Sequence, residues 1–305
     1  MGKKIELKAV ELTADQLERR LNHLIDNNNY LQGINQPPIA MCIEGESGLG
    51  KTSIVEQVAH KRGMNYVKIN LAQIGEEVSE LVGYPIRQFQ MCKTENNECI
   101  WVDEPVVESY KGKGYDFTGL NRTGYCPPEW ISGLDNKPGI FNLDDFTRGS
   151  IRTLQAVMEI ISRQEFISWK LPKGWSVILT SNPSDGEYLI NELDNAQKSR
   201  YTSVNLKFDI ECWARYAEMN GIDSRCINFL LLHPDLVTKE CNPRSITMFF
   251  NSISSFKSFS DSVADIQEIG EGSVGPEMAT MFTMFINNKL DQLMNPVRMV
   301  LDKDY

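Results

Sequence analysis

The most informative motif in the chain is Gly45-Glu46-Ser47-Gly48-Leu49-Gly50-Lys51-Thr52. This stretch agrees with the pattern G-x-x-x-x-G-K-[ST] at every fixed position. Glycines in the pattern let successive backbone N–H groups turn inward around a phosphate. The lysine, Lys51, then reaches the β- and γ-phosphates, and the Thr52 hydroxyl takes one position on Mg²⁺. The stretch therefore predicts that Gly45 to Ser53 bind a nucleoside triphosphate.

The residues on either side supply the context that this pattern needs. Ile39-Ala40-Met41-Cys42-Ile43 is a short apolar run, which is typical of a buried parallel strand. The segment from Ser53 to Arg62 is predicted to be a helix that Gly63 ends, with basic residues in its last turn. The N-terminus of this helix adds the positive end of its dipole to the loop. Strand, loop and helix together predict a phosphate-binding site rather than a chance glycine-rich turn.

Composition and charge exclude several classes of protein. The formal net charge of −10 argues against a broad basic surface for nucleic acid, although a local patch fits inside an acidic total. No apolar run approaches the roughly 20 residues that a bilayer span requires. The N-terminus lacks the apolar core of a signal peptide. We therefore expect a cytoplasmic protein without a membrane anchor.

The cysteines are odd in number, widely scattered and contain no C-x-x-C pair, which favours reduced thiols. Three of them fall in one irregular region and offer zinc as an alternative, although no fourth Cys or His lies nearby in the sequence. These three are Cys92, Cys99 and Cys126.

Strands alternate with helices from residue 37 to residue 208, which predicts an α/β domain with a doubly wound parallel sheet. The predicted strands cover residues 39–43, 65–71, 139–145, 175–183 and 203–206, and an amphipathic helix covers 150–163. Residues 1–36 are predicted to be a capping segment whose helix begins at a capping box, Thr13 with Gln16, and ends at Asn27-Asn28-Asn29.

Two regions depart from this alternation. An irregular insert spans about residues 88–138, and within it a hairpin is predicted between residues 98–107 and 115–120. Residues 209–305 contain only helical patterns, capped by Asp209, Asp223 and Asn242, with a loop at 270–276 and a last helix at 277–293. They are predicted to form a second, all-helical domain.

Hydrolysis of a triphosphate needs a second acid beside the metal and a group that orients the attacking water. Two apolar strands end in acids, one at Asp103-Glu104 and the other at Asp144-Asp145. A single helix separates Asp144 from the strand that ends at Asn182, which is the spacing of neighbouring strands in a βαβ unit. This order favours Asp144 as the magnesium ligand.

Asp145 is then the base that orients the water. It is one methylene shorter than glutamate, so we expect slow hydrolysis or a local adjustment. Asn182 can hydrogen-bond both the water and a γ-phosphate oxygen.

With these residues in place the chain resembles an AAA+ ATPase, and more narrowly the MoxR family, over about residues 35–255. The family's Walker A loop, Walker B strand with its DE-x-x-R run, and sensor-1 Asn fall on 45–52, on Asp144-Asp145-Phe146-Thr147-Arg148 and on Asn182. Its arginine finger and sensor-2 Arg fall on Arg200 and Arg244. The departures are Asp145 in place of Glu and the insert before the Walker B strand.

The resemblance implies a P-loop NTPase core with a helical lid, which hydrolyses ATP with Mg²⁺ in a ring, commonly a hexamer. Arg200 would reach the γ-phosphate of a neighbouring subunit, and Arg244 would contact phosphate in its own subunit and couple the lid angle to nucleotide state. The implied function is chaperone-like remodelling of a protein, often with a partner that carries a von Willebrand factor A domain.

Two alternatives stay open at the level of sequence. One is a nucleic-acid-linked AAA+ ATPase such as a helicase loader, for which Lys111 and Lys113 would be the contact residues. The other is a nucleotide-dependent binding module whose ATPase is weak because of Asp145.

Overall fold

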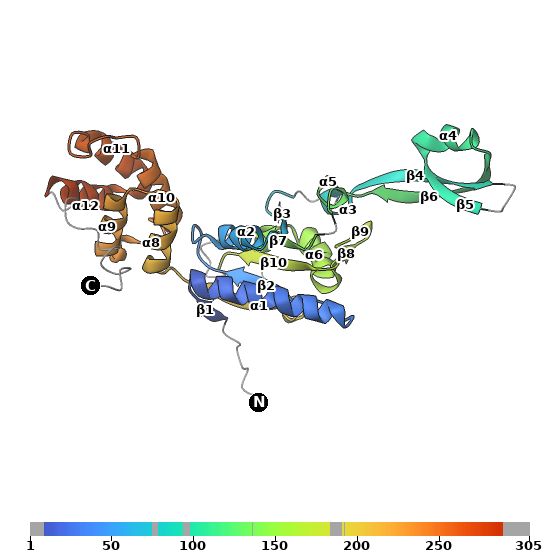
Figure 1. Cartoon of the computed structure of the whole chain (residues 1–305), viewed down its shortest axis with the longest axis horizontal. Coiled ribbons are helices and arrows are strands. Elements are labelled where there is room, and N and C mark those ends of the chain that lie inside the picture. The colour runs from blue at the N-terminus through green and yellow to red at the C-terminus, as the bar shows by residue number, and fades with distance from the viewer. Residues whose placement is uncertain are drawn as a thin grey trace, which may run out of the picture.

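A parallel sheet forms the centre of the molecule, with a helical region on one side and a long arm on the other (Figure 1). The computed structural model describes residues 9–74, 79–93, 98–135, 137–183, 191 and 193–288. The strands of the sheet run in the order β1-β11-β2-β10-β7-β3, and all their pairings are parallel. They are β1 (Val10–Leu12), β11 (Tyr201–Leu206), β2 (Ala40–Glu44), β10 (Trp175–Ser181), β7 (Gly139–Asp144) and β3 (Asn65–Asn70). The predicted fold class is therefore confirmed.

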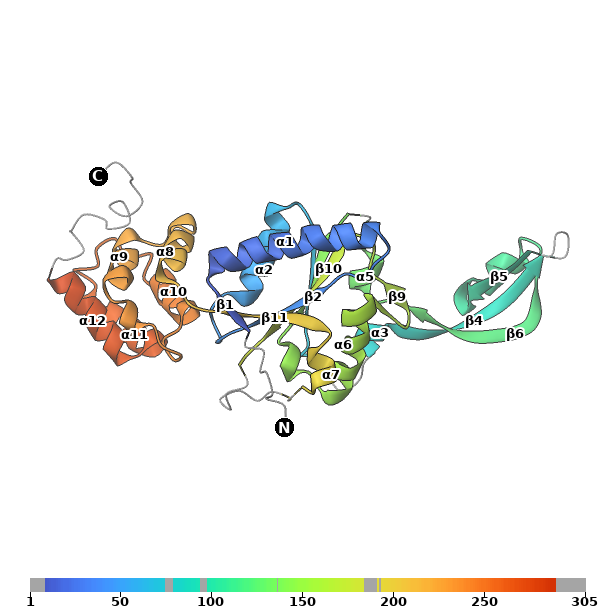
Figure 2. The same ribbon diagram turned by 90° about the horizontal axis from the view of Figure 1, so that it is seen from below.

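Helices cover both faces of this sheet because alternate residues of its buried strands point to opposite sides. Met41 and Ile43 of β2 pack in one apolar cluster with α1 (Ala14–Gly33) and α2 (Lys51–Lys61). Ala40 and Cys42 pack in the other cluster with α6 (Ile151–Arg163). Figure 2 shows α1 lying along the sheet. Ile151, an apolar residue in the first turn of α6, is 66% exposed.

Helix α1 begins as predicted, with the capping box of Thr13 and Gln16, but it does not end at Asn27-Asn28-Asn29. Asn28 is completely buried, and its side chain bridges α1 to two strands. Its Nδ2 donates to the Ile39 carbonyl at 2.9 Å and to Ser176 Oγ at 3.0 Å, while its Oδ1 accepts from the Ile39 N–H at 2.8 Å. The side chain is thus committed to tertiary contacts, and the helix continues to Gly33.

The irregular insert contains a separate antiparallel sheet that projects from the core as an arm (Figure 1). After α3 (Ser79–Val82) come β4 (Tyr84–Lys93), β5 (Glu98–Asp103), the 3₁₀ turn η1 (Glu104–Val106), α4 (Val107–Lys111) and β6 (Tyr115–Cys126). The prediction of a hairpin between 98–107 and 115–120 is wrong, because β5 and β6 each pair with β4 and not with each other.

The arm also corrects the prediction that all cysteines are reduced. Cys92 of β4 and Cys99 of β5 are direct neighbours across the ladder and form a disulfide. Cys126 lies at the other end of the arm, opposite Tyr84. Within the described residues no cluster of three or more His, Cys, Asp or Glu side chains could hold a metal ion, so the zinc alternative has no support there.

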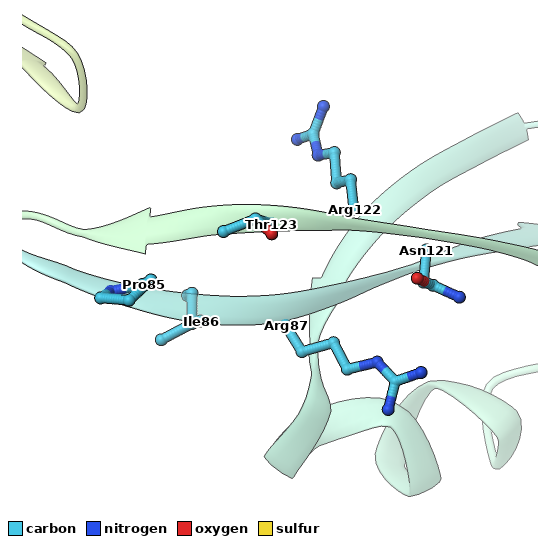
Figure 3. A pocket seen from close by; sticks show the side chains of 6 residues that line it. All are labelled: Pro85, Ile86, Arg87, Asn121, Arg122 and Thr123. Atoms are coloured by element: carbon cyan, nitrogen blue, oxygen red, sulfur yellow. The ribbon is translucent and has the colours of Figure 1, made fainter.

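A hollow of about 510 Å³ lies where β4 and β6 twist around each other (Figure 3). Arg87 pairs with Thr123, and Arg122 pairs with Gln88, so the two arginines belong to opposite faces of the ribbon. Figure 3 shows their side chains pointing away from each other. They therefore do not converge on one ligand in this hollow.

Short elements also lie between the arm and the end of the central sheet. Those in the described residues are α5 (Glu129–Ser132), η2 (Phe146–Arg148), the two-stranded hairpin of β8 (Glu165–Phe166) with β9 (Trp169–Lys170), and α7 (Asn195–Lys198).

The helical region contains α8 (Ile210–Met219), α9 (Ser224–Leu232), η3 (Pro234–Leu236), α10 (Pro243–Ser252), α11 (Val263–Val274) and α12 (Pro276–Asn287). Asp209, Asp223 and Asn242 cap their helices as predicted. Its core is a cluster of phenylalanine rings, including Phe229, Phe249, Phe250, Phe282 and Phe285.

The predicted loop at 270–276 is wrong, because α11 continues to Val274 and α12 begins at Pro276. Gly270 lies inside α11, and a Cβ there would come within 2.8 Å of Ala279 Cβ and 3.2 Å of the Phe249 ring. The glycine therefore permits close helix packing rather than marking a loop. Residues 289–293 of the last predicted helix lie outside the described residues. No helix in the described part of the chain is long and apolar enough to cross a bilayer.

Candidate functional site

The loop between β2 and α2 curls at three glycines with positive φ: Gly45, Gly48 and Gly50. Gly48 has φ of +80°, and a Cβ at this position would lie 2.2 Å from Asn242 Oδ1. The glycine is required both for the left-handed backbone and for the close approach of α10, which begins at Pro243. The loop is thus closed on one side by the N-terminus of a helix from the helical region.

Lys51 is 9% exposed, and its ammonium group is folded against the loop. Its Nζ donates to the carbonyls of Gly45 at 2.6 Å and Glu46 at 2.9 Å, and to Asn182 Oδ1 at 3.1 Å. Burial lowers the pKa of Lys51 to about 8, against the opposing attraction of nearby carboxylates, chiefly Asp145. A triphosphate beside Lys51 would favour its charged form and remove this penalty.

The carboxylate of Asp144 lies beside the end of the loop. Thr52 Oγ1 donates to Asp144 Oδ1 at 2.7 Å, and Thr180 Oγ1 donates to the same oxygen. A hydroxyl and a carboxylate are hard oxygen donors of the kind that Mg²⁺ prefers, and Mg²⁺ is usually held by one or two such groups plus phosphates. These residues therefore fit the metal that the sequence implies.

Asp145 occupies the left-handed region, with φ of 51° and ψ of 39°. Asp and Asn adopt this region more readily than longer side chains do. Asn70, at the end of β3, donates from Nδ2 to Asp145 Oδ2 at 3.4 Å. The backbone thus gives a reason for Asp where the resembled family has Glu.

The structure brings Lys51, Thr52, Asp144, Asp145 and Asn182 together at the carboxyl ends of three neighbouring strands. The competing acids are elsewhere, because Asp103 ends β5 and Glu104 begins η1 in the arm. There Asp103 accepts from Gln88 Nε2 at 2.9 Å, and Glu104 is exposed. Their placement in a separate sheet excludes them from this cluster.

Arg244 stands in the first turn of α10 and lines the same hollow as the loop. Arg200 does not join the cluster in its own chain. It is exposed and precedes β11, whose first residue, Tyr201, pairs with Ala40 at the start of β2. Arg200 therefore lies at the amino-terminal end of these parallel strands, whereas the loop follows their carboxyl-terminal end. The length of β2 separates the two by about 16 Å at the usual rise per residue.

A hollow of about 590 Å³ is lined by the loop, by the helical region and by the N-terminus of α1. Its apolar lining includes Leu49, Ile54, Leu206, Phe208 and Trp213. A volume of this size suits a small organic ligand. Leu49 belongs to the predicted binding loop. Sequence reasoning did not find the other four, since they are spread over several distant segments and share no local pattern.

The lysines of the nucleic-acid alternative lie on the arm and already have partners. Lys111 Nζ donates to Glu108 Oε1 at 2.7 Å, and Lys113 Nζ lies 4.9 Å from the centre of the Tyr110 ring.

Comparison with known proteins agrees with this geometry. Residues 41–106 match the model of the ATPase family associated with various cellular activities (AAA). This segment of the chain is therefore similar to part of an AAA ATPase domain. The matched residues begin in β2, include the whole phosphate-binding loop, and end at η1 in the arm.

One curated protein to which the chain is similar is Lon protease homolog 2, peroxisomal, of Caenorhabditis elegans. It is 32% identical over 114 residues, which are 33% of this chain and 14% of that protein. This chain thus spans a small part of that relative's length.

Among solved structures, a substituted RuvB of Thermotoga maritima matches with a TM-score of 0.43 and 11% identity, covering 93% of this chain and 75% of that one. The Thermotoga maritima RuvB Holliday junction branch migration motor matches with a TM-score of 0.44 and 10% identity, covering 94% and 74%.

Proposed function

We propose that this chain is an AAA+ ATPase that hydrolyses ATP with Mg²⁺ in a ring of identical subunits and uses the cycle to remodel a protein partner. One observation carries the proposal: the Lys51 ammonium, the Thr52–Asp144 pair, Asp145 and Asn182 converge beside a glycine loop with positive φ angles. This arrangement is the set of groups that phosphoryl transfer to water requires.

Each residue has a distinct role in the proposed reaction. Lys51 would leave the loop carbonyls and bind the β- and γ-phosphates, and Thr52 with Asp144 would hold Mg²⁺, which neutralises charge on those phosphates. Asp145 would accept a proton from water while the water oxygen bonds to the γ-phosphorus and the bond to the bridging oxygen of ADP breaks. Asn182 would fix the water and a γ-phosphate oxygen. The apolar hollow beside Trp213 and Phe208 would take the adenine ring.

Arg200 and Arg244 would extend the site beyond one AAA domain. Arg200 is exposed and precedes β11, at the end of the strands away from its own loop. In this proposal it would reach a neighbouring subunit rather than its own loop. An arginine supplied from a neighbour can raise the rate by about 10³–10⁵. Arg244 would bind phosphate from the lid, as in the MoxR family that the sequence resembles. This family assignment, a hexameric ring and a partner with a von Willebrand factor A domain all belong to the proposal.

Turnover of ATP tests the enzymatic part. We expect measurable phosphate release from the wild-type chain, none from Lys51→Ala, and none from Asp145→Asn, which should still bind ATP. Addition of Arg200→Ala subunits to wild-type subunits should lower turnover more steeply than simple dilution does. Turnover that is equal in Lys51→Ala and wild type would refute the proposal.

Affinity capture tests the remodelling part. Asp145→Asn with ATP should retain a protein partner that Lys51→Ala does not retain. Capture of nucleic acid alone, with an affinity that falls steeply with salt and is lost on changing Lys111 and Lys113, would favour the helicase-loader class instead.

A further inference from the structure

The side chain of Thr180 lies between the two acids of the site without lining the nucleotide hollow. Thr180 is on β10 and is 1% exposed. Its Oγ1 donates to Asp144 Oδ1 at 2.5 Å and accepts from the Asp145 backbone N–H at 3.4 Å. One hydroxyl group therefore contacts the side chain of the first acid and the backbone of the second.

The strand register explains why Thr180 reaches both acids. β10 and β7 are parallel neighbours, and their ladder pairs Ile178 with Asn142 and Leu179 with Leu143. The next position along each strand is Thr180 on β10 and Asp144 on β7. Since the side chains at matched positions of neighbouring strands point to the same face, the hydroxyl and the carboxylate meet.

The backbone at Asp145 needs such a contact. Its left-handed conformation is unfavourable for a residue other than glycine and persists only where surrounding contacts support it. The Thr180 hydroxyl accepts from the N–H of this residue, and the Asp145 carbonyl in turn accepts from the Arg148 N–H at 2.9 Å. These bonds fix the direction in which the Asp145 side chain leaves the strand.

The hydroxyls of Thr52 and Thr180, which both donate to Asp144 Oδ1, would have different roles when ATP and Mg²⁺ are bound. In the proposed function the Thr52 oxygen would also bind Mg²⁺ through a lone pair, so Thr52 would serve the metal directly. Thr180 is buried in the sheet and donates to the same Asp144 oxygen. Its hydroxyl has no metal to bind in this proposal, so its contribution would be to orient the acids.

We propose that Thr180 is a positioning residue that sets the orientation of Asp144 toward Mg²⁺ and of Asp145 toward water through its single hydroxyl. This inference rests on the proposed function. Groups that orient metal ligands in this way typically matter by 10- to 100-fold in metal affinity or activity.

Three variants test the inference. Thr180→Val removes the hydroxyl and keeps the shape, and Thr180→Ser keeps the hydroxyl. Thr202→Val makes the same change on β11, where the hydroxyl donates to the Ala40 carbonyl at 3.4 Å. For each variant we would measure turnover and the KM for ATP. We would also measure how ATP affinity increases with Mg²⁺, and the Mg²⁺ concentration that gives half of this increase. Thermal unfolding is measured alongside to compare their stability.

For Thr180→Val we expect kcat to fall about 10- to 100-fold and the half-saturating Mg²⁺ concentration to rise by a similar factor. ATP affinity in EDTA should stay within about twofold of wild type, because the loop itself is unchanged. Thr180→Ser and Thr202→Val should stay close to wild type in all three measurements. If Thr180→Val behaves like Thr202→Val, or if Thr180→Ser loses as much as Thr180→Val, the inference is overturned.

The magnesium measurement separates this inference from the proposed function. If wild-type protein binds ATP but never releases phosphate, the proposed hydrolysis fails, while the shift in Mg²⁺ dependence still decides the role of Thr180. If hydrolysis is present and Thr180→Val leaves kcat and the Mg²⁺ dependence unchanged, only the inference about Thr180 fails.

Discussion

Raising the pH from 7.5 to 9.5 should weaken ATP binding through Lys51 alone. In the free protein, burial lowers the pKa of Lys51 to about 8. A bound triphosphate stabilises the ammonium form and raises this pKa again, because opposite charges within a few ångströms favour the charged state. Above pH 8 the protein must therefore take up a proton when it binds ATP, and its affinity decreases as pH rises.

The size of the effect follows from the protonated fraction of Lys51. The affinity scales inversely with 1 + 10^(pH − 8) while the bound form stays protonated. This factor grows about 25-fold between pH 7.5 and 9.5, which corresponds to about 1.9 kcal/mol. The last proton of a terminal phosphate has a pKa of about 6, so ATP itself does not titrate in this range.

Fluorescence titration with an ATP analogue across this pH range measures the effect, and Lys51→Arg is its matched control. Arginine stays charged throughout, so the affinity of Lys51→Arg should be lower overall but independent of pH. A wild-type affinity that stays constant to pH 9.5, or that falls equally in Lys51→Arg, would show that Lys51 is not the titrating group. The geometry around its ammonium would then need another explanation.

Three further changes test the packing around the site. Gly48→Ala should weaken ATP binding in the same titration, because its left-handed backbone alone costs about 1–2 kcal/mol and its Cβ would collide with Asn242; unchanged affinity would contradict this. Asn28→Ala should lower the free energy of unfolding in urea by about 1–3 kcal/mol, since it leaves the partly buried Ile39 N–H without its acceptor. No loss of stability would contradict the bridge. Gly270→Ala should destabilise the helical region by about 1–3 kcal/mol in thermal unfolding, because its Cβ would collide with Ala279. Gly272→Ala in the same helix has open space around it and should stabilise the region by about 0.5–1 kcal/mol. Equal effects of the two variants would contradict the packing argument.

The central sheet and the cluster at its edge could be predicted because parallel strands bring their carboxyl ends together. The loop pattern identified one strand, and the order of strand, helix and strand placed Asp144 next to the strand of Asn182. Local pattern alone would have chosen Asp103-Glu104, which end a strand in the arm. Topology was therefore more informative than the likeness of a short motif.

The arm could not be predicted because the sequence of its first strand, β4, lacks the alternation of apolar and polar residues that is typical of a strand. Pro85 follows the first residue of β4, and the ladder shifts register between Phe89 and Met91, so the alternation of apolar residues is broken. Without β4, the remaining strands were paired with each other, and the pairing of Cys92 with Cys99 had no basis. The neighbour that Arg200 would reach is likewise absent from a single chain's pattern.

The way the arm joins the core sets how freely its length can vary. Tyr84 and Cys126 face each other across the ladder, so the chain leaves and re-enters the body of the protein at adjacent points. Segments whose ends meet in this way can be inserted or exchanged with little disturbance to their host. The arm can therefore change in length, or gain and lose its disulfide, during evolution without a change in the phosphate-binding loop.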